Sequence, residues 1–210
     1  MTTQEPAAAH PHAREVRRAR RLEYLTLGYN ALEAVVSLGA GIAAGSTALV
    51  GFGTDSLIES TSGAALLWRL RDGQGHERRE RIALRLVGAS FLLLAAYVAY
   101  ESAGALLRRE PPDASYVGMG IAVLSLIVMP WLARQKRHAA ARINSRSLHA
   151  DSRQTSLCAY LSAILLGGVA LNALLGWWWA DPVAALVMVP IIAHEGVEAL
   201  RGERCEDCAH

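Results

Sequence analysis

The chain has 210 residues and a formal net charge of +2 at pH 7, with 52% of its residues hydrophobic and 19% charged. The charges are clustered, and none falls in Ala34–Thr54, Ala114–Ala133 or Gln154–Ala180. Each of these stretches is about as long as the roughly 20 residues that a helix needs to cross a bilayer. This argues against a soluble domain. Because the arginines flank apolar stretches without interleaved aromatic residues, it also argues against nucleic-acid binding.

Hydropathy predicts membrane-crossing helices along most of the chain. The predicted spans are, in order, Leu22–Ala44, Thr47–Trp68, Ala83–Leu107, Ala114–Ala133, Asp151–Gly176 and Pro182–Leu200. We therefore expect an all-α, polytopic membrane protein whose six-helix bundle occupies 22–200 and contacts the lipid bilayer. A basic N-terminal arm at 1–21 would precede the bundle, and a short Cys/His tail at 201–210 would follow it. The arm lacks the apolar core of a cleavable signal peptide.

The basic residues predict the orientation of this bundle. They gather before the first span, between the second and third spans, and between the fourth and fifth spans, where Lys136 is one of them. By the positive-inside rule these segments and both termini are cytoplasmic, which indicates the cytoplasmic (inner) membrane. Trp177–Trp179 would then lie at the outer interface, and Asp181 is expected to be the N-cap of the last helix.

The second predicted span contains the most informative pair of residues, Asp55 and Glu59. A carboxylate at this depth costs several kcal/mol unless it is neutralised or paired, so an acid inside a membrane span indicates function. The spacing of four residues places both side chains on one helical face. Two buried acids that close repel each other unless a cation or a proton intervenes, so we expect this pair to bind one.

The fifth predicted span carries a polar stripe with Asp151, Gln154 and Cys158 on one helical face. Two acids, a thiol and an amide at a helix interface form a plausible ligand set for a divalent cation. Carboxylate oxygen and thiolate sulfur together favour zinc, because magnesium and calcium rarely take a thiol. The alternative for Cys158 is a small buried hydrophobic side chain without a ligand role.

Other polar residues in the spans have two interpretations. Glu33, on the first span, is a candidate for proton coupling, or it forms only a hydrogen bond between helices. His194, Glu195 and Glu198 lie near the inner end of the last span and form either a cytoplasmic entry site or the polar end of that helix. We expect these three residues to lie outside the main site.

The sequence resembles the cation diffusion facilitators at these residues. Ser46–Leu49 followed by the acid pair of Asp55–Glu59 resembles their second transmembrane helix. The segments that contain Asp151, Gln154 and Cys158, and then Ala180–Pro182, resemble their fifth and sixth helices. The resemblance implies a homodimer that exports Zn²⁺ or a similar divalent ion from the cytoplasm in exchange for protons.

The resemblance also implies a ligand set from helices two and five. Matched by position, the ligands would be Asp55 and Glu59 with Gln154 and Cys158. The family's usual pair on helix five is histidine or aspartate followed by aspartate, so this chain departs there. A neutral amide is a weak ligand, and Asp151 or water is the alternative to Gln154.

The ending is a second departure from the family pattern. Family members usually continue into a cytoplasmic domain with a ferredoxin-like fold, and we expect none here. The tail instead contains Cys205, Cys208 and His210, which form either a possible soft-cation site or an unstructured end.

We expect transport and no catalysis or cofactor, with a divalent cation, preferably Zn²⁺, as the cargo. Metal and protons would compete for the same lone pairs, so a proton gradient can drive the metal outward. Two alternatives remain from the sequence alone. One is a non-transporting membrane subunit that binds or senses metal, and the other is an intramembrane enzyme that uses Asp55 and Glu59 as acid and base.

Overall fold

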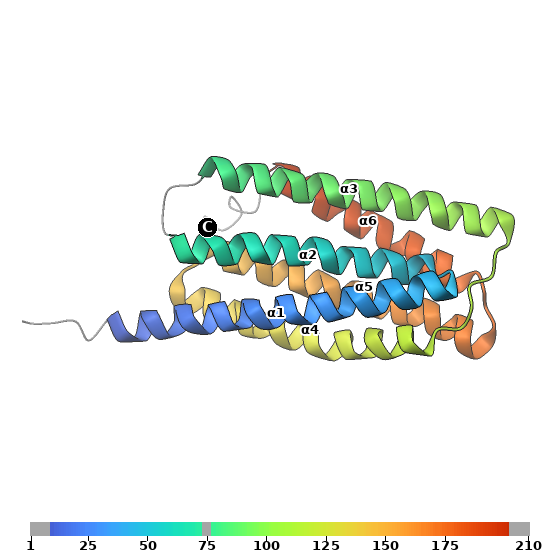
Figure 1. Cartoon of the computed structure of the whole chain (residues 1–210), viewed down its shortest axis with the longest axis horizontal. Coiled ribbons are helices and arrows are strands. Elements are labelled where there is room, and N and C mark those ends of the chain that lie inside the picture. The colour runs from blue at the N-terminus through green and yellow to red at the C-terminus, as the bar shows by residue number, and fades with distance from the viewer. Residues whose placement is uncertain (1–8, 73–76, 202–210) are drawn as a thin grey trace, which may run out of the picture.

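A computed structural model describes residues 9–72 and 77–201, and every element in these ranges is a helix (Figure 1). In chain order the helices are α1 (Ala9–Ala44), α2 (Thr47–Asp72), α3 (Glu77–Arg108), α4 (Tyr116–Ile143), α5 (Arg146–Leu175) and α6 (Ala180–Arg201). They run up and down along the long axis of the molecule and form a single elongated bundle. The predicted all-helical polytopic bundle is confirmed.

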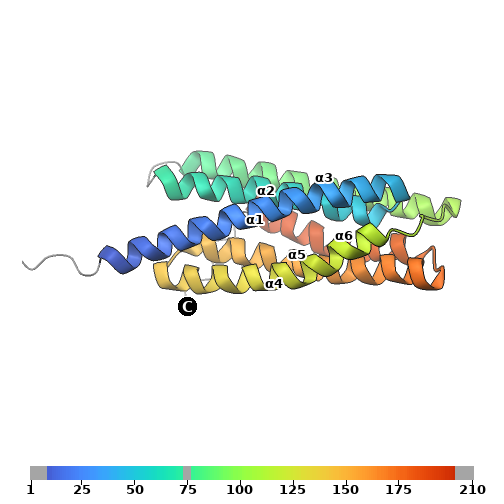
Figure 2. The same cartoon turned by 60° about the horizontal axis from the view of Figure 1, so that its bottom comes forward.

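The arrangement places α2 inside the bundle. It contacts α1, α3, α5 and α6, whereas α3 lies against α6 along one edge and α4 lies against α5 and α1 (Figure 2). The turn from α1 to α2 consists only of Gly45 and Ser46, and Gly45 adopts the left-handed φ of +64° that ends α1. The turn from α4 to α5 is equally short, because Asn144 ends α4 with a φ of 50° and Ser145 caps α5.

Within the described residues, α1, α3, α4, α5 and α6 each contain a stretch long and apolar enough to cross a membrane, whereas the described part of α2 does not. It carries Asp55 and Glu59 in its first half, yet its 26 residues give a length of about 39 Å at ~1.5 Å per residue. Two of its hydroxyl groups are satisfied within the helix, since Thr54 and Ser60 each donate to the carbonyl oxygen four residues back. The neighbouring helices thus enclose a polar α2.

Helices α1 and α4 extend beyond the predicted spans. The part of the predicted basic arm from Ala9 onward is helical and continues into the first span without a break, and α4 continues past Ala133 to Ile143. The two extensions are joined by polar contacts: Arg142 Nη1 lies 2.7 Å from Glu15 Oε1, and Arg18 Nη2 donates to Gln135 Oε1 at 2.7 Å. Most residues expected in the cytoplasmic connection between spans four and five therefore lie on helices.

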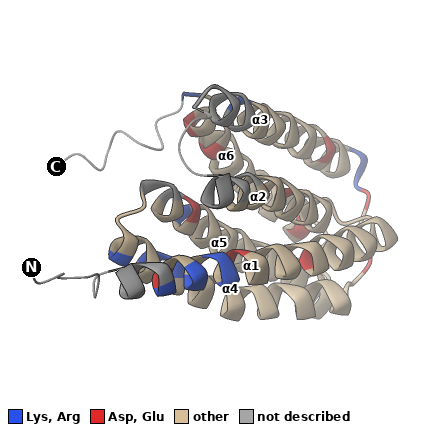
Figure 3. Cartoon of the chain, turned by 60° about the vertical axis from the view of Figure 1, so that its left-hand side comes forward, with Lys and Arg blue, Asp and Glu red and all other residues tan. Residues whose placement is uncertain are grey.

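Lysine and arginine residues gather at one end of the bundle (Figure 3). This is the end where α1 and α5 begin and where α4 and α6 finish. At the opposite end, the described residues include the adjacent pair Arg108 and Arg109, close to the acidic Glu110 and Asp113. The charge asymmetry on which the predicted orientation depends is therefore present in the folded chain, and the orientation itself stays a prediction.

Asp181 does not cap its own helix as expected, because α6 already begins at Ala180. Its carboxylate reaches the neighbouring turn between α1 and α2 instead. Ser46 Oγ donates to Asp181 Oδ1 at 2.5 Å, and the backbone N–H of Ala48 donates to Oδ2 at 3.4 Å. A carboxylate next to the free N–H groups at the start of α2 is favourably placed, so Asp181 fastens α6 to α2.

Two glycines bring α3 and α6 into close contact. A Cβ atom at Gly88 would lie 2.7 Å from the carbonyl oxygen of Gly196, and one at Gly196 would lie 3.0 Å from the carbonyl oxygen of Gly88. Any larger residue would force the two helices apart. This approach fixes the position of Glu195, the residue next to Gly196, relative to Phe91 on α3.

Candidate cation site

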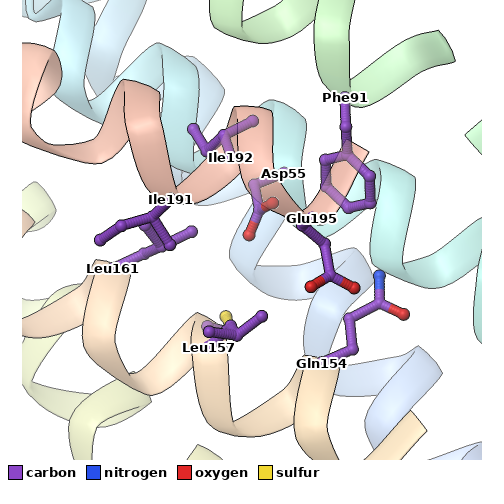
Figure 4. A pocket seen from close by; sticks show the side chains of 9 residues that line it. Asp55, Phe91, Gln154, Leu157, Leu161, Ile191, Ile192 and Glu195 are labelled. Atoms are coloured by element: carbon purple, nitrogen blue, oxygen red, sulfur yellow. The ribbon is translucent and has the colours of Figure 1, made fainter. Parts of the chain in front are cut away.

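A pocket opens between α2, α3, α5 and α6 inside the bundle. Its polar lining consists of Asp55, Gln154, Cys158 and Glu195, and the rest of the lining is leucine and isoleucine side chains with the ring of Phe91. Figure 4 shows the carboxylates of Asp55 and Glu195 and the amide of Gln154 turned towards the same space. A small number of polar groups that converge within an apolar pocket is typical of a binding site.

The structure brings three of the predicted site residues together and separates a fourth from them. Asp55, Gln154 and Cys158 line the pocket and are 6%, 4% and 1% exposed. Glu59 is also buried, but it is not part of this lining. Its Oε1 atom accepts a hydrogen bond from Thr155 Oγ1 on α5 at 3.0 Å. The acid pair of α2 therefore faces α5 along two successive turns, one at the pocket and one beside Thr155.

Glu33 lies directly behind Cys158. The thiol of Cys158 donates to Glu33 Oε1 at 3.5 Å, and Ser56 Oγ donates to the same oxygen at 2.5 Å. Glu33 on α1 thus links α2 and α5 by hydrogen bonds. This is the interhelical role considered as one alternative from the sequence, and it also places a carboxylate in contact with the candidate thiol ligand.

Asp151 does not line the pocket, although it was the secondary candidate for the fourth ligand position. Its Oδ2 atom accepts a hydrogen bond from Lys136 Nζ on α4 at 2.5 Å. Lys136 Nζ also lies 3.3 Å from both carboxylate oxygens of Glu23 on α1, and 3.3 Å from Thr155 Oγ1. Asp151 thus belongs to an ion pair among α1, α4 and α5.

Lys136 was counted among the basic residues between spans four and five, but the structure places it on α4 with a side chain that is 0% exposed, and its cytoplasmic position stays a prediction. Two signals in the sequence point to burial. Lys136 is the only lysine among 21 basic residues. It also continues an apolar helical face, since Leu132, Ala133, Ala139 and Ala140 lie three or four residues away and are all buried.

Glu195, which we expected to lie outside the main site, lies at the pocket instead. Its side chain lines the pocket, whereas His194 is 73% exposed and lies 3.6 Å from Glu198. The signal was again the helical face: Glu195 shares it with Met188, Ile192 and Ala199, which are all buried.

In the part of the chain that the structure describes, no three His, Cys, Asp or Glu side chains lie close enough to hold a metal ion. Asp55, Glu195 and Cys158 line the same pocket but are not in a coordinating arrangement. A metal ion would have to draw them together by side-chain rotation. The tail residues Cys205, Cys208 and His210 lie outside the described residues.

These features define a class of protein. Within a multi-pass helical membrane bundle, buried carboxylates face a common pocket, and such groups are typical of pathways for ions. The comparisons with known proteins agree with this class. A family model described as "Cation efflux transmembrane domain" matches residues 24–203. The chain therefore belongs to the cation efflux family, whose members are transporters and not enzymes, which removes the alternative of an intramembrane enzyme.

Individual relatives are distant and longer. An uncharacterized transporter of Synechocystis is 27% identical over 194 residues, which cover 88% of this chain and 63% of the relative. A protein of Bacillus subtilis, named as a cadmium, cobalt and zinc/H⁺-K⁺ antiporter, is 29% identical over 131 residues, which cover 58% of this chain and 39% of the relative. An uncharacterized transporter of Methanocaldococcus jannaschii is 24% identical over 119 residues, which cover 57% of this chain and 42% of the relative. The matched segments thus span less than two thirds of these relatives.

Proposed function

We propose that the chain exports divalent metal cations, with Zn²⁺ preferred, from the cytoplasm in exchange for protons. In this proposal it acts as a homodimer in the cytoplasmic membrane, as the family resemblance implies. The observation that carries the proposal is the pocket with Asp55, Gln154 and Cys158 on facing sides of α2 and α5. The family match and the B. subtilis antiporter support cation transport.

The proposed ligands are Asp55 and Cys158 with Gln154 as a weak oxygen donor. Glu59 joins them if its side chain leaves Thr155 and turns towards the pocket. Glu195 adds a carboxylate from α6 that the sequence alone did not assign to the site. The thiol favours zinc or cadmium over harder ions, because thiolate sulfur is a soft ligand.

Proton exchange follows from the ligand chemistry. Cys158 must lose its proton before the sulfur can bind a metal ion. In the structure the thiol proton is directed to Glu33 Oε1. We therefore infer that Glu33 relays this proton: it takes the proton from the thiol and releases it to the cytoplasmic side when metal binds, and protons from the outer side return to the thiol and the carboxylates when metal leaves. The site then exchanges the metal ion for protons, so that its carboxylates are never left charged without a cation or a proton inside the membrane.

The test is metal uptake into proteoliposomes that are acidic inside. Wild-type protein should accumulate Zn²⁺ at a rate that falls when the pH gradient is collapsed. Asp55→Asn should abolish accumulation. Asp113→Asn makes the same chemical change in an exposed loop residue and should transport normally. Zn²⁺ accumulation by Asp55→Asn at the wild-type rate would reject the assignment. Binding without accumulation by the wild-type protein would instead favour the non-transporting subunit.

A further inference from the structure

The ion pair around Lys136 is a second polar cluster, separate from the pocket. Its oxygens come from Glu23 on α1 and from Asp151 and Thr155 on α5. Lys136 and Glu23 are both 0% exposed, and the Asp151 side chain is 7% exposed. Taking an ammonium group out of water costs several kcal/mol, and only close anionic partners compensate for that cost. The fold therefore keeps a positive charge at this position despite the free-energy cost of removing it from water.

The oxygens that surround Lys136 Nζ resemble the ligands of a metal ion. Two carboxylates and one hydroxyl lie 2.5–3.3 Å from the nitrogen. Hard divalent cations bind such oxygens at about 2.0–2.6 Å, so the groups that lie 3.3 Å from the nitrogen would need to close in by about 0.7–1.3 Å. Glu23 Oε1 points to the ammonium but makes no hydrogen bond to any described residue, and it has a free lone pair for a cation.

Thr155 connects this cluster to the proposed transport site. Lys136 Nζ donates to Thr155 Oγ1, and the Thr155 hydroxyl lies 3.0 Å from Glu59 Oε1 and 3.2 Å from the carbonyl oxygen of Asp151. A metal ion that reached Glu59 would therefore be one hydroxyl group away from two further carboxylates. Without a resident cation, these carboxylates would attract the ion strongly.

We propose that Glu23, Asp151 and Thr155 form a second cation site, which the Lys136 ammonium occupies permanently. The lysine keeps divalent ions out of this site and confines them to the pocket beside Asp55. The statement that Lys136 keeps transported metal out of this site rests on the proposed function. The statement that the lysine ammonium occupies a cation site does not. The relevant ligand class is a hard or borderline divalent cation that accepts carboxylate oxygen.

The experiment counts bound Mn²⁺, which prefers oxygen ligands, in the full-length, detergent-purified protein by equilibrium dialysis. Lys136→Ala should bind one ion per chain more than its parent. Adding Glu23→Gln to Lys136→Ala should remove that additional ion, because the site loses one of its two charged ligands. Lys136→Arg keeps the charge and should bind no additional ion. Arg134→Ala removes an exposed positive charge from the same helix and should also leave the count unchanged.

The same comparison is made in an Asp55→Asn background. The measured quantity is the difference in bound ions between the protein with Lys136→Ala and its parent. The additional ion should therefore appear in this background as well, even if Asp55 proves not to bind metal. If Lys136→Ala aggregates without metal, purification in Mn²⁺ should restore a folded, monodisperse protein. A folded Lys136→Ala protein without an additional ion overturns the proposal. A Lys136→Ala protein that stays aggregated in saturating Mn²⁺ also overturns it.

Discussion

Replacing Lys136 by methionine is the most informative test of how the bundle is stabilised. The substitution keeps the length of the side chain and removes its charge. In the wild-type protein the buried carboxylates of Asp151 and Glu23 lie 2.5 and 3.3 Å from the lysine nitrogen, and the substitution leaves both without a cation. Removing one partner of a buried ion pair costs about 3–5 kcal/mol of the free energy of unfolding. Asp151→Asn should cost less, because Lys136 then keeps Glu23 as its partner.

The measurement is thermal unfolding in detergent with a metal chelator, followed by tryptophan fluorescence. A change of 1 kcal/mol shifts the melting temperature of a chain of this size by roughly 2–4 °C, so Lys136→Met should melt roughly 6–20 °C below wild type. The triple variant Lys136→Met, Glu23→Gln, Asp151→Asn contains no charge in the cluster. It should recover most of the loss, because uncharged replacements of a buried ion pair are often neutral. Equal melting temperatures for Lys136→Met and the wild type would refute this reasoning.

Three further predictions concern transport in proteoliposomes. Cys158→Asp should lower the rate for Zn²⁺ relative to Mn²⁺, and an unchanged ratio would count against a thiolate ligand. Glu33→Gln cannot receive the thiol proton, so its Zn²⁺ uptake should depend less on the pH gradient than wild-type uptake; an unaltered dependence would exclude Glu33 from coupling. Glu195→Gln should raise the KM for Zn²⁺ several-fold and leave the fold intact, whereas His194→Gln, next to it but exposed, should have no effect.

The sequence was sufficient for the fold class because a bilayer imposes long apolar helices. It was also sufficient for the polar faces of α2 and α5, since helical periodicity alone places Asp55 and Cys158 on interior faces. Periodicity does not indicate how two helices are rotated relative to each other. That rotation sends Gln154 to the pocket and Asp151 to Lys136, only three residues away along the same helix.

The burial of Lys136 and the position of Glu195 at the pocket were not expected from the sequence, and the two have one physical cause. Both residues were expected at the membrane surface, because charged residues near the ends of apolar stretches usually lie there. In the folded chain α4 extends past its apolar stretch, and the close contact of Gly88 with Gly196 holds Glu195 against the pocket. The apolar helical face on which each residue lies therefore predicts its burial better than its distance from the end of the span does.

The account depends most directly on a metal ion bound between α2 and α5. X-ray absorption at the zinc edge tests this on Zn²⁺-loaded protein in which Cys205 and Cys208 are replaced by serine, so that Cys158 is the only sulfur ligand left among cysteines. The account predicts one sulfur neighbour at about 2.3 Å, with oxygen or nitrogen atoms in the remaining positions. Cys158→Ser should remove this sulfur signal, and Asp55→Asn should weaken zinc binding itself. Bound zinc with only oxygen and nitrogen neighbours, unchanged by Cys158→Ser, would contradict the account.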